Sequence, residues 1–199
     1  MRILAFSDLH CDLDQAARLT EMSESADVVI GAGDFASIHN GLVETIDALS
    51  GIEKPTVLVA GNNETIEALR EAAADWPAAT VLHGDSTEIE GRTFYGLGGG
   101  IPVTPWDWSF DLEETEAEAR LADLPEGAVL VVHSPPKGHC DEAGGGLSLG
   151  SPAILRAIEE KQPVLAVCGH IHESWGRTSK VGETDIANLG PAGTYFELP

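Results

Sequence analysis

Short apolar runs alternate with amphipathic segments along most of the chain, and this alternation is the strongest constraint on its fold. The runs are rich in Val, Ile, Leu and Ala, as buried strands are, and they cover residues 3–6, 28–30, 56–60, 128–132 and 164–167. Segments with helical periodicity follow the first three runs at 14–24, 40–50 and 64–74. Strands that alternate with helices pair largely in parallel through right-handed crossovers, so we predict an α/β fold.

The middle and the end of the chain have a different pattern, which predicts hairpins. Residues 88–95 favour a turn near Gly91, with a second group of strands beginning at about Val81. Residues 174–187 favour another hairpin with its turn at 180–183, and a Glu-rich helix is predicted at 111–122 after a loop at 98–110. Because we find no linker or repeat in 199 residues, we expect a single domain over residues 1–199.

Each of the five predicted strands is followed by a side chain that can bind a metal ion. After the fifth strand, His170 and His172 are two residues apart, so in an extended segment both imidazoles would face one point. Ligands of open α/β sheets bind at the carboxyl ends of strands, so five such positions in phase indicate one site. The candidate metal ligands are Asp8, His10, Asp34, Asn62, His133, His170 and His172.

The number and type of these side chains indicate the chemistry of the site. Two aspartates, one asparagine and four histidines are too many for one tetrahedral zinc ion and suit two ions that share a carboxylate. Only the two aspartates are charged, so two divalent ions would leave the cluster positive and attractive to an anion. We therefore expect a small phosphorylated substrate, since a metal pair can stabilise both the entering and the leaving oxygen of a displacement at phosphorus.

In their order, these motifs resemble the five motifs of the calcineurin-like metallophosphoesterases, and the resemblance runs from Met1 to about Gly190. The motifs are Asp8-Leu9-His10, Gly33-Asp34, Gly61-Asn62-Asn63-Glu64, His133 and Gly169-His170-Ile171-His172. The resemblance implies a four-layer α/β/β/α sandwich with mixed sheets. It also implies a metal-dependent phosphoesterase in which a hydroxide bridging two ions attacks a phosphate mono- or diester.

The same resemblance implies how the ligands would be divided between the two ions. Asp8, His10 and His172 would hold the first ion. Asn62, His133 and His170 would hold the second, and Asp34 would bridge the pair. Manganese, iron and zinc all fit this mixture of nitrogen and oxygen ligands.

One position departs from the family pattern. Many members have a histidine after the motif asparagine, where it can protonate the leaving group or bind phosphate, whereas this chain has Asn63. An amide can donate a hydrogen bond but cannot act as a general acid near neutral pH, so substrates with good leaving groups would suffer least. His39 follows Asp34 by five residues and could lean over the site in its place, although a solvated histidine at a helix start is the simpler interpretation.

The charge of the chain is strongly negative. Its 33 acidic and 11 basic residues give a formal net charge of −22, with the acidic residues dispersed along the sequence. Molar salt shortens the Debye length to about 3 Å and so suppresses self-repulsion, and we therefore hypothesise a salt-rich, halophilic cytoplasm. A melting temperature that falls on going from low salt to molar KCl would contradict this hypothesis; an acidic protein from an ordinary cytoplasm is the alternative.

Other observations narrow the classes of function. No signal-peptide pattern or membrane-length apolar run is visible, so we predict a cytoplasmic location and no membrane partner. The shortage of lysine and arginine makes nucleic acid an unfavourable partner, although a nuclease of the same family stays an alternative, as does a non-catalytic interaction scaffold on the same fold. Trp106 and Trp108 could form an aromatic wall of the pocket or simply pack their loop onto the core. The sequence does not define the substrate, the metal or the oligomeric state.

Overall fold

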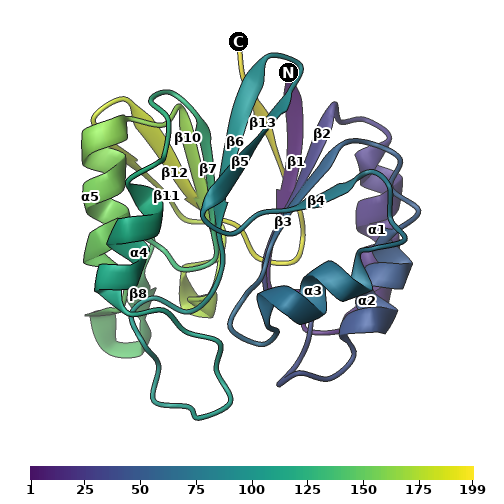
Figure 1. Cartoon of the computed structure of the whole chain (residues 1–199), viewed down its shortest axis with the longest axis horizontal. Helices are drawn as coiled ribbons and strands as arrows, with labels where there is room; N and C mark the ends of the chain where they lie inside the picture. The colour runs from purple at the N-terminus through teal and green to yellow at the C-terminus, as the bar shows by residue number, and fades with distance from the viewer.

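A computed structural model describes residues 1–199, and in it two β-sheets are stacked face to face between two layers of helices (Figure 1). The first sheet has the strand order β13-β1-β2-β3-β4. Its strands are β1 (Arg2–Phe6), β2 (Val28–Ala32), β3 (Thr56–Val59), β4 (Ala79–Val81) and β13 (Thr194–Glu197), and its helices are α1 (Leu13–Ser23), α2 (Leu42–Leu49) and α3 (Ile66–Ala72).

The second sheet has the order β11-β12-β10-β7-β6-β5. Its strands are β5 (Asp85–Ile89), β6 (Arg92–Leu97), β7 (Val129–Val132), β10 (Leu165–Cys168), β11 (Thr178–Val181) and β12 (Thr184–Asn188), covered by α4 (Glu114–Leu121) and α5 (Pro152–Lys161). A small hairpin of β8 (Glu142–Ala143) and β9 (Leu147–Ser148) encloses the 3₁₀ turn η1 (Gly144–Gly146), and a second 3₁₀ turn, η2 (His172–Ser174), follows β10. The inner strands of both main sheets pair in parallel, as does the edge strand β4. The other edge strands, β13, β11 and β5, pair antiparallel, so both sheets are mixed, as predicted.

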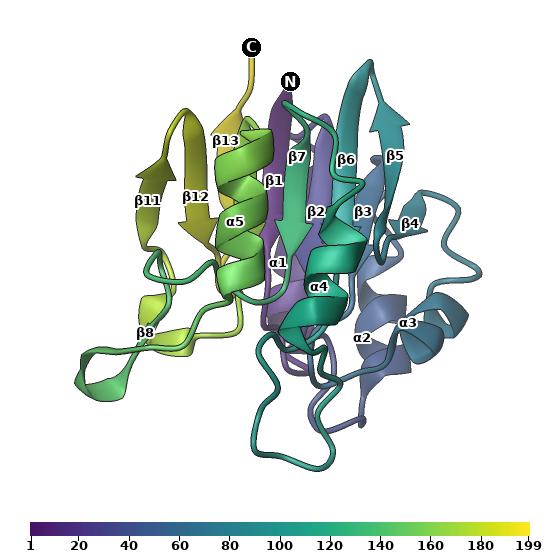
Figure 2. The same ribbon diagram turned by 60° about the vertical axis from the view of Figure 1, so that its left-hand side comes forward.

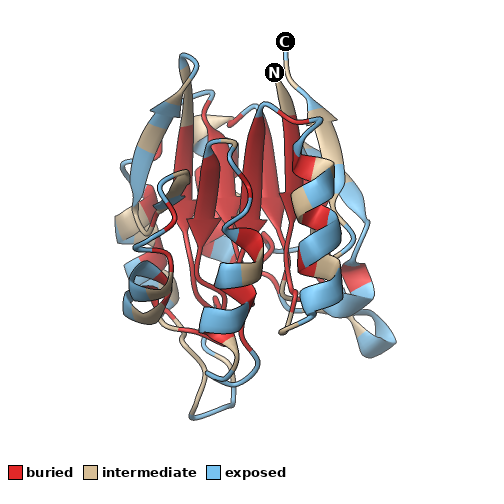
Figure 3. Ribbon diagram, turned by 90° about the vertical axis from the view of Figure 1, so that its right-hand side faces the viewer, coloured by how far each residue is buried: buried red, intermediate tan, exposed pale blue.

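Strand alternation builds three hydrophobic layers (Figure 3). In β2, Val29 packs toward the helices of the first sheet, whereas Val28 and Ile30 face the space between the sheets. In β7, Leu130 and Val132 face the other helix layer. Buried on both faces, these strands are continuously apolar, which is why they are easily recognised in the sequence.

Three of the five α-helices begin where a side chain accepts one of their first backbone N–H groups. Asp12 accepts from the Gln15 N–H at 2.9 Å before α1, Thr65 caps α3, and Ser151 caps α5 ahead of Pro152. The helix expected at 14–24 is present one residue earlier, and those expected at 40–50, 64–74 and 111–122 are present with shorter bounds. None of the helices has the length and apolar character that crossing a bilayer requires.

One prediction about the strands needs correction. The second group of strands begins at Asp85 and not at Val81, because β4 is one more parallel strand of the first sheet: α3 returns to it and Trp76 anchors the connection by donating its Nε1–H to the Ile52 carbonyl at 2.9 Å. At the chain end, Tyr195 and Phe196 lie in β13, which pairs antiparallel with β1 and forms one edge of the first sheet.

The carboxyl ends of the parallel strands in both sheets meet at one end of the molecule, opposite the two chain termini (Figure 2). Two loops extend beyond the strands there, one between β6 and α4 and the other carrying β8 and β9. The strand ends and the two loops thus define one functional face.

Candidate metal centre

The predicted ligands leave their strands in an unusual backbone conformation. Asp8, His10, Asp34 and His170 have φ angles of 57°, 45°, 57° and 67°, in the left-handed region that non-glycine residues seldom adopt. Such conformations persist only where the surroundings hold them, and they concentrate at functional sites. The left-handed φ of His170 also interrupts the extended segment that was expected there, and His170 and His172 fall in different groups of possible metal ligands.

Six of the predicted residues form two compact groups of possible metal ligands. The outer set is Asp8, His10 and His172, and the inner set is Asp34, His133 and His170; within each set the ligand atoms lie within 4.8 Å of one another. Asp34 lies between the sets, with its Oδ2 3.5 Å from His10 Nε2 and its Oδ1 3.4 Å from His133 Nε2. The sets are also adjacent through His10 Nε2 and His172 Nε2, which are 3.2 Å apart.

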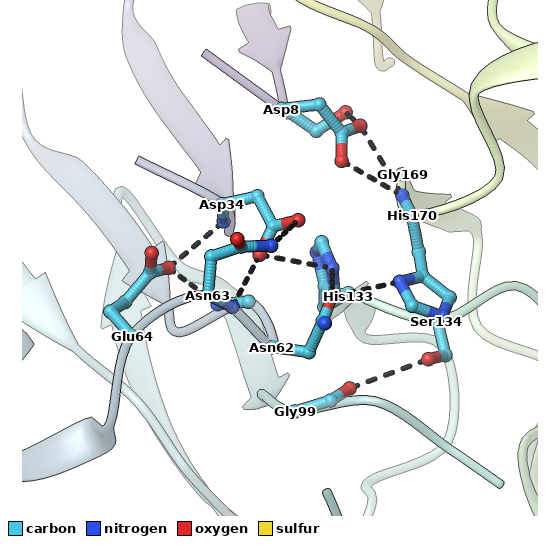
Figure 4. A network of polar contacts seen from close by, with 12 residues as sticks. Asp8, Asp34, Asn62, Asn63, Glu64, Gly99, His133, Ser134, Gly169 and His170 are labelled. Atoms are coloured by element: carbon cyan, nitrogen blue, oxygen red, sulfur yellow. Dashed lines mark hydrogen bonds and ion pairs between the residues drawn. The ribbon is translucent and has the colours of Figure 1, made fainter. Parts of the chain in front are cut away.

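Asn62 joins the inner set. Its Oδ1 lies 3.2 Å from His133 Nε2 and 3.0 Å from His170 Nδ1 (Figure 4). All seven predicted ligands therefore gather at one site, although the chain positions span Asp8 to His172.

The hydrogen bonds of the imidazoles leave their other ring nitrogens directed at oxygens. His133 Nδ1–H donates to the Ala32 carbonyl at 2.8 Å, and His10 Nδ1–H donates to the Ala36 carbonyl at 3.2 Å. In a neutral ring the Nε2 atom is then an acceptor, and it faces the acceptor oxygens of Asp34 and, for His133, Asn62. Acceptor atoms that face one another repel, and only a proton or a cation between them removes this repulsion. The set of nitrogen and oxygen atoms therefore fits metal ions.

The pKa values reflect the same crowding. Burial alone would lower the pKa of His133, but the Asp34 carboxylate outweighs it and raises that pKa to about 9. Burial acts against the charged form of Asp34 too, yet His133 and His10 hold the pKa of this carboxyl well below its usual range. Burial and the positive charge of His133 together lower the pKa of His170 to about 3, which leaves its ring neutral and suited to a metal ion.

Two residues after Asn62, a buried glutamate holds the inner loops in place. Glu64 accepts the backbone N–H groups of Asp34, Gly61 and Ala36 at 2.9, 2.6 and 3.0 Å. Burial, reinforced by the nearby Asp34 charge, raises the pKa of Glu64 to about 7. This positioning role was not deduced from the sequence, where only the motif position of Glu64 was noted.

Asn63 is bound to Asp34 twice. Its backbone N–H and its Nδ2–H donate to the two carboxylate oxygens at 2.9 and 2.8 Å, and its Oδ1 accepts the Ile38 N–H at 2.9 Å. His39 does not line the cleft at the site: its Nε2–H donates to the Trp108 carbonyl at 2.6 Å. These contacts favour positioning roles for both residues.

Contacts from distant segments orient one ligand in each set. Asn62 Nδ2–H donates to Ser109 Oγ at 2.9 Å, and the Ser109 hydroxyl donates to Asp111 Oδ1 at 2.7 Å, so the Asn62 oxygen faces the histidines. Asp8 Oδ2 accepts Trp175 Nε1–H at 3.0 Å and the Ser7 hydroxyl at 2.5 Å. Sequence reasoning missed these supports, because no local pattern connects such distant positions.

Close approach of the backbone makes two glycines obligatory. A Cβ on Gly61 would lie 2.0 Å from Asp34 Oδ1, and a Cβ on Gly169 would lie 2.4 Å from Asp8 Oδ2. Each glycine therefore allows one strand end to approach a carboxylate of the other motifs.

The candidate metal centre opens into a cleft of about 580 Å³ between the two protruding loops. Trp106 and Trp108 line it, as do Ile38, Val103 and Leu149. No lysine or arginine is among its lining residues, whereas Glu173 is. The aromatic wall considered from the sequence is thus present.

Sequence comparison identifies related proteins. Residues 1–198 match the family model of the calcineurin-like phosphoesterase superfamily domain. The UPF0046 protein K07C11.7 of Caenorhabditis elegans is 27% identical over 209 residues, 94% of this chain and 69% of that protein. Human metallophosphoesterase domain-containing protein 1 is 33% identical over 101 residues, 48% of this chain and 30% of its own length. The UPF0046 protein T07D4.2 of C. elegans is matched over 28% of its length, so the chain spans less than a third of the latter two relatives.

Solved structures share the fold. A protein of Thermus thermophilus matches with a TM-score of 0.77 and 20% identity over 96% of this chain and 90% of that one. The phosphopantetheinyl hydrolase of Mycobacterium tuberculosis matches with a TM-score of 0.67 and 17% identity over 94% and 88% of the two chains. A dimetal phosphatase of Danio rerio matches with a TM-score of 0.61 and 13% identity over 96% and 88%. At these identities, the likeness establishes the four-layer fold and nothing finer.

Proposed function

Because the chain belongs to the calcineurin-like phosphoesterase superfamily over residues 1–198, we propose that it is a dinuclear, metal-dependent hydrolase of phosphate mono- or diesters. One observation carries the proposal: the Asp34 carboxylate lies between two ligand sets and directs one oxygen toward each. The outer set would hold one ion, and the inner set with Asn62 would hold the other. Manganese, iron and zinc all suit these ligands.

When bound, two such ions would supply a bridging hydroxide nucleophile and positive charge to offset the phosphoryl oxygens. In the net reaction, an oxygen of water bonds to phosphorus, the P–O bond to the leaving group breaks, and the departing alcohol takes up a proton. Asn63 fixes both oxygens of Asp34, and the Ala36 and Ala32 carbonyls keep the Nε2 atoms of His10 and His133 directed inward.

No side chain in the cleft is clearly placed to act as the general acid that protonates the leaving group. The sequence offers Asn63 and His39 as candidates for this role, but the Asn63 amide is engaged with Asp34 and Ile38, and His39 lies outside the cleft and is engaged with Trp108. We therefore expect leaving groups of low pKa to react best. An unchanged kcat in His39→Ala, with a leaving-group dependence as steep as that of the wild type, would exclude His39 as the acid.

The test is hydrolysis of a chromogenic phosphodiester and its monoester in molar KCl with manganese, alongside metal analysis. We expect two bound ions per chain and turnover that a chelator abolishes. In Asp34→Asn, we expect both the turnover and the metal content to fall. Bound metal without turnover would contradict activity on simple esters, whereas neither metal nor turnover would favour the interaction scaffold. A nucleic-acid substrate is disfavoured by the absence of cationic side chains from the cleft.

A further inference from the structure

Exposed apolar side chains are concentrated beside the metal centre. Four of the nine large hydrophobic residues that are exposed line the cleft: Ile38, Val103, Trp106 and Leu149 are 49%, 50%, 50% and 40% exposed. Single exposed apolar residues need no explanation, but a group of them around a polar site marks a surface for apolar ligands.

The central part of this surface is a pair of stacked indoles. The rings of Trp106 and Trp108 are 5.4 Å apart between centroids and only 9° from parallel. Both residues line the cleft, so they provide a flat aromatic surface within the same cavity as His10, His170 and His172. We call Trp106 and Trp108 the aromatic platform.

The loop that carries the platform is fixed to the metal centre. The Phe110 N–H donates to the Asn62 carbonyl at 3.0 Å, Ser109 Oγ accepts from the Asn62 amide, and the Trp108 carbonyl accepts from His39. Asp111 Oδ2 accepts both the N–H and the hydroxyl of Thr104 at 2.8 Å. These bonds hold the loop in place before a ligand binds. The binding of an aromatic ring there therefore costs little conformational entropy of the protein.

The charges in the cleft restrict what else the substrate can carry. Further phosphate or carboxylate groups would normally be met by arginine or lysine, and no such residue lines this cleft, while Glu173 does. A ligand with one negative charge at phosphorus and an uncharged flat substituent matches the arrangement best.

We propose that the substrate is a singly charged phosphodiester with an aromatic substituent that stacks on the aromatic platform, an inference that rests on the proposed phosphoesterase function. Water cleaves one ester bond and the leaving group departs with a proton, while the platform holds the substituent that stays on phosphorus.

The experiment compares two diesters with the same leaving group. Bis(p-nitrophenyl) phosphate and methyl p-nitrophenyl phosphate both release p-nitrophenol, but only the first retains an aryl group for the platform. We expect Trp106→Ala to reduce the ratio of their kcat/KM values by about 10-fold, the size of one aromatic stacking contact. Comparing each variant with the wild type cancels the intrinsic reactivities of the esters. Trp106→Phe should restore most of the ratio, and Val43→Ala, an exposed apolar change on α2 away from the cleft, should leave it unchanged.

A binding measurement complements the kinetics. Diphenyl phosphate should quench tryptophan fluorescence with a Kd about 10-fold weaker in Trp106→Ala than in the wild type. Turnover of both esters with a ratio unaffected by Trp106→Ala would overturn this inference and leave the phosphoesterase function standing. Absence of turnover with either ester would overturn the function and the inference together.

Discussion

The inner and outer ligand sets contain the same residue types, one buried aspartate and two histidines, but their histidines differ in exposure. The His133 side chain of the inner set is 0% exposed, whereas His172 and His10 of the outer set are 46% and 26% exposed. The inner set lies at the carboxyl ends of the strands, where His133 Nδ1–H donates to the carbonyl of Ala32, the last residue of β2. The outer set opens into the cleft.

This difference indicates that the two sets contribute differently to the protein. Buried charges must be compensated, so the inner set influences folding even without a ligand. The two histidines of the outer set are partly exposed, although Asp8 is buried, so replacing either histidine should affect ion binding and leave the fold largely intact. The inner ion should accordingly be the more slowly exchanging one.

Asp34→Asn should break the comparison, because both sets lose the carboxylate that faces them. The new amide would also direct an N–H toward Asn63 Nδ2, which now donates to Asp34 at 2.8 Å. We expect kcat to fall by at least about 10³-fold, since loss of charge at a metal pair costs several kcal/mol. Metal content should fall below one ion per chain, and a variant that keeps two ions and turns over normally would refute the shared role of Asp34.

The pH dependence of stability should distinguish the inner set in chelator-treated protein. The pKa of His133 rises from 6.5 to about 9 on folding. Protonated His133 therefore contributes fully to the stability of the fold below pH 6.5, and this contribution is lost as pH rises through about 9. The loss lowers the free energy of unfolding by about 3 kcal/mol. Urea denaturation from pH 6 to 9.5 measures it.

The matched controls are two histidine substitutions. His133→Gln should flatten the decrease with pH, whereas His139→Gln, in the loop before β8, should retain it. An equally flat profile in the wild type would show that the His133–Asp34 pair does not contribute to stability.

His172→Gln should sharpen the comparison by affecting the outer set alone. We expect the second equivalent of metal to bind at least about 100-fold more weakly, since even indirect supports of metal ligands are worth 10- to 100-fold. Because His172 is half exposed, the free energy of unfolding of the chelator-treated variant should differ from that of the chelator-treated wild type by less than about 0.5 kcal/mol. Calorimetric metal titration and urea denaturation provide the two readouts, and equal weakening of both equivalents would contradict independent sets.

Ser109→Ala should produce the smallest effect, through the orientation of Asn62. Without the hydroxyl, the Asn62 amide loses its acceptor, and we expect the inner ion to bind about 10-fold more weakly. Thr104→Val is the matched control, because Thr104 donates to the same Asp111 but does not contact Asn62. If the two variants weaken the inner ion equally, the effect comes from the loop as a whole and not from Asn62.

The features that were predictable from the sequence are those encoded over a few adjacent residues. Strands β2 and β7 are buried on both faces and are continuously apolar, so they and the polar residues after them can be recognised directly. Strand β13 has no buried residue and therefore no continuous apolar signal, and its place beside β1 depends on a partner almost two hundred residues away.

The candidate site was also predictable only in its local features. Ligand identities follow from the strand ends, but their directions depend on backbone turns such as that at His170 and on contacts such as Ser109 with Asn62 and Trp175 with Asp8. These involve separations of 47 and 167 residues, over which a single sequence carries no local signal.

The pairing of β1 with β13 also makes the molecule suitable for circular permutation. The Met1 ammonium donates to the Leu198 carbonyl at 2.8 Å, and the Leu198 N–H donates to the Met1 carbonyl at 2.9 Å, so a linker of a few residues can join the ends. New ends can be opened at Gly91, in the turn between β5 and β6, where no heavy atom approaches within 4 Å of an added Cβ. Both the joined and the opened positions lie at the end of the sandwich opposite the loops that border the cleft (Figure 1), so a permuted chain keeps the mouth of the cleft unobstructed.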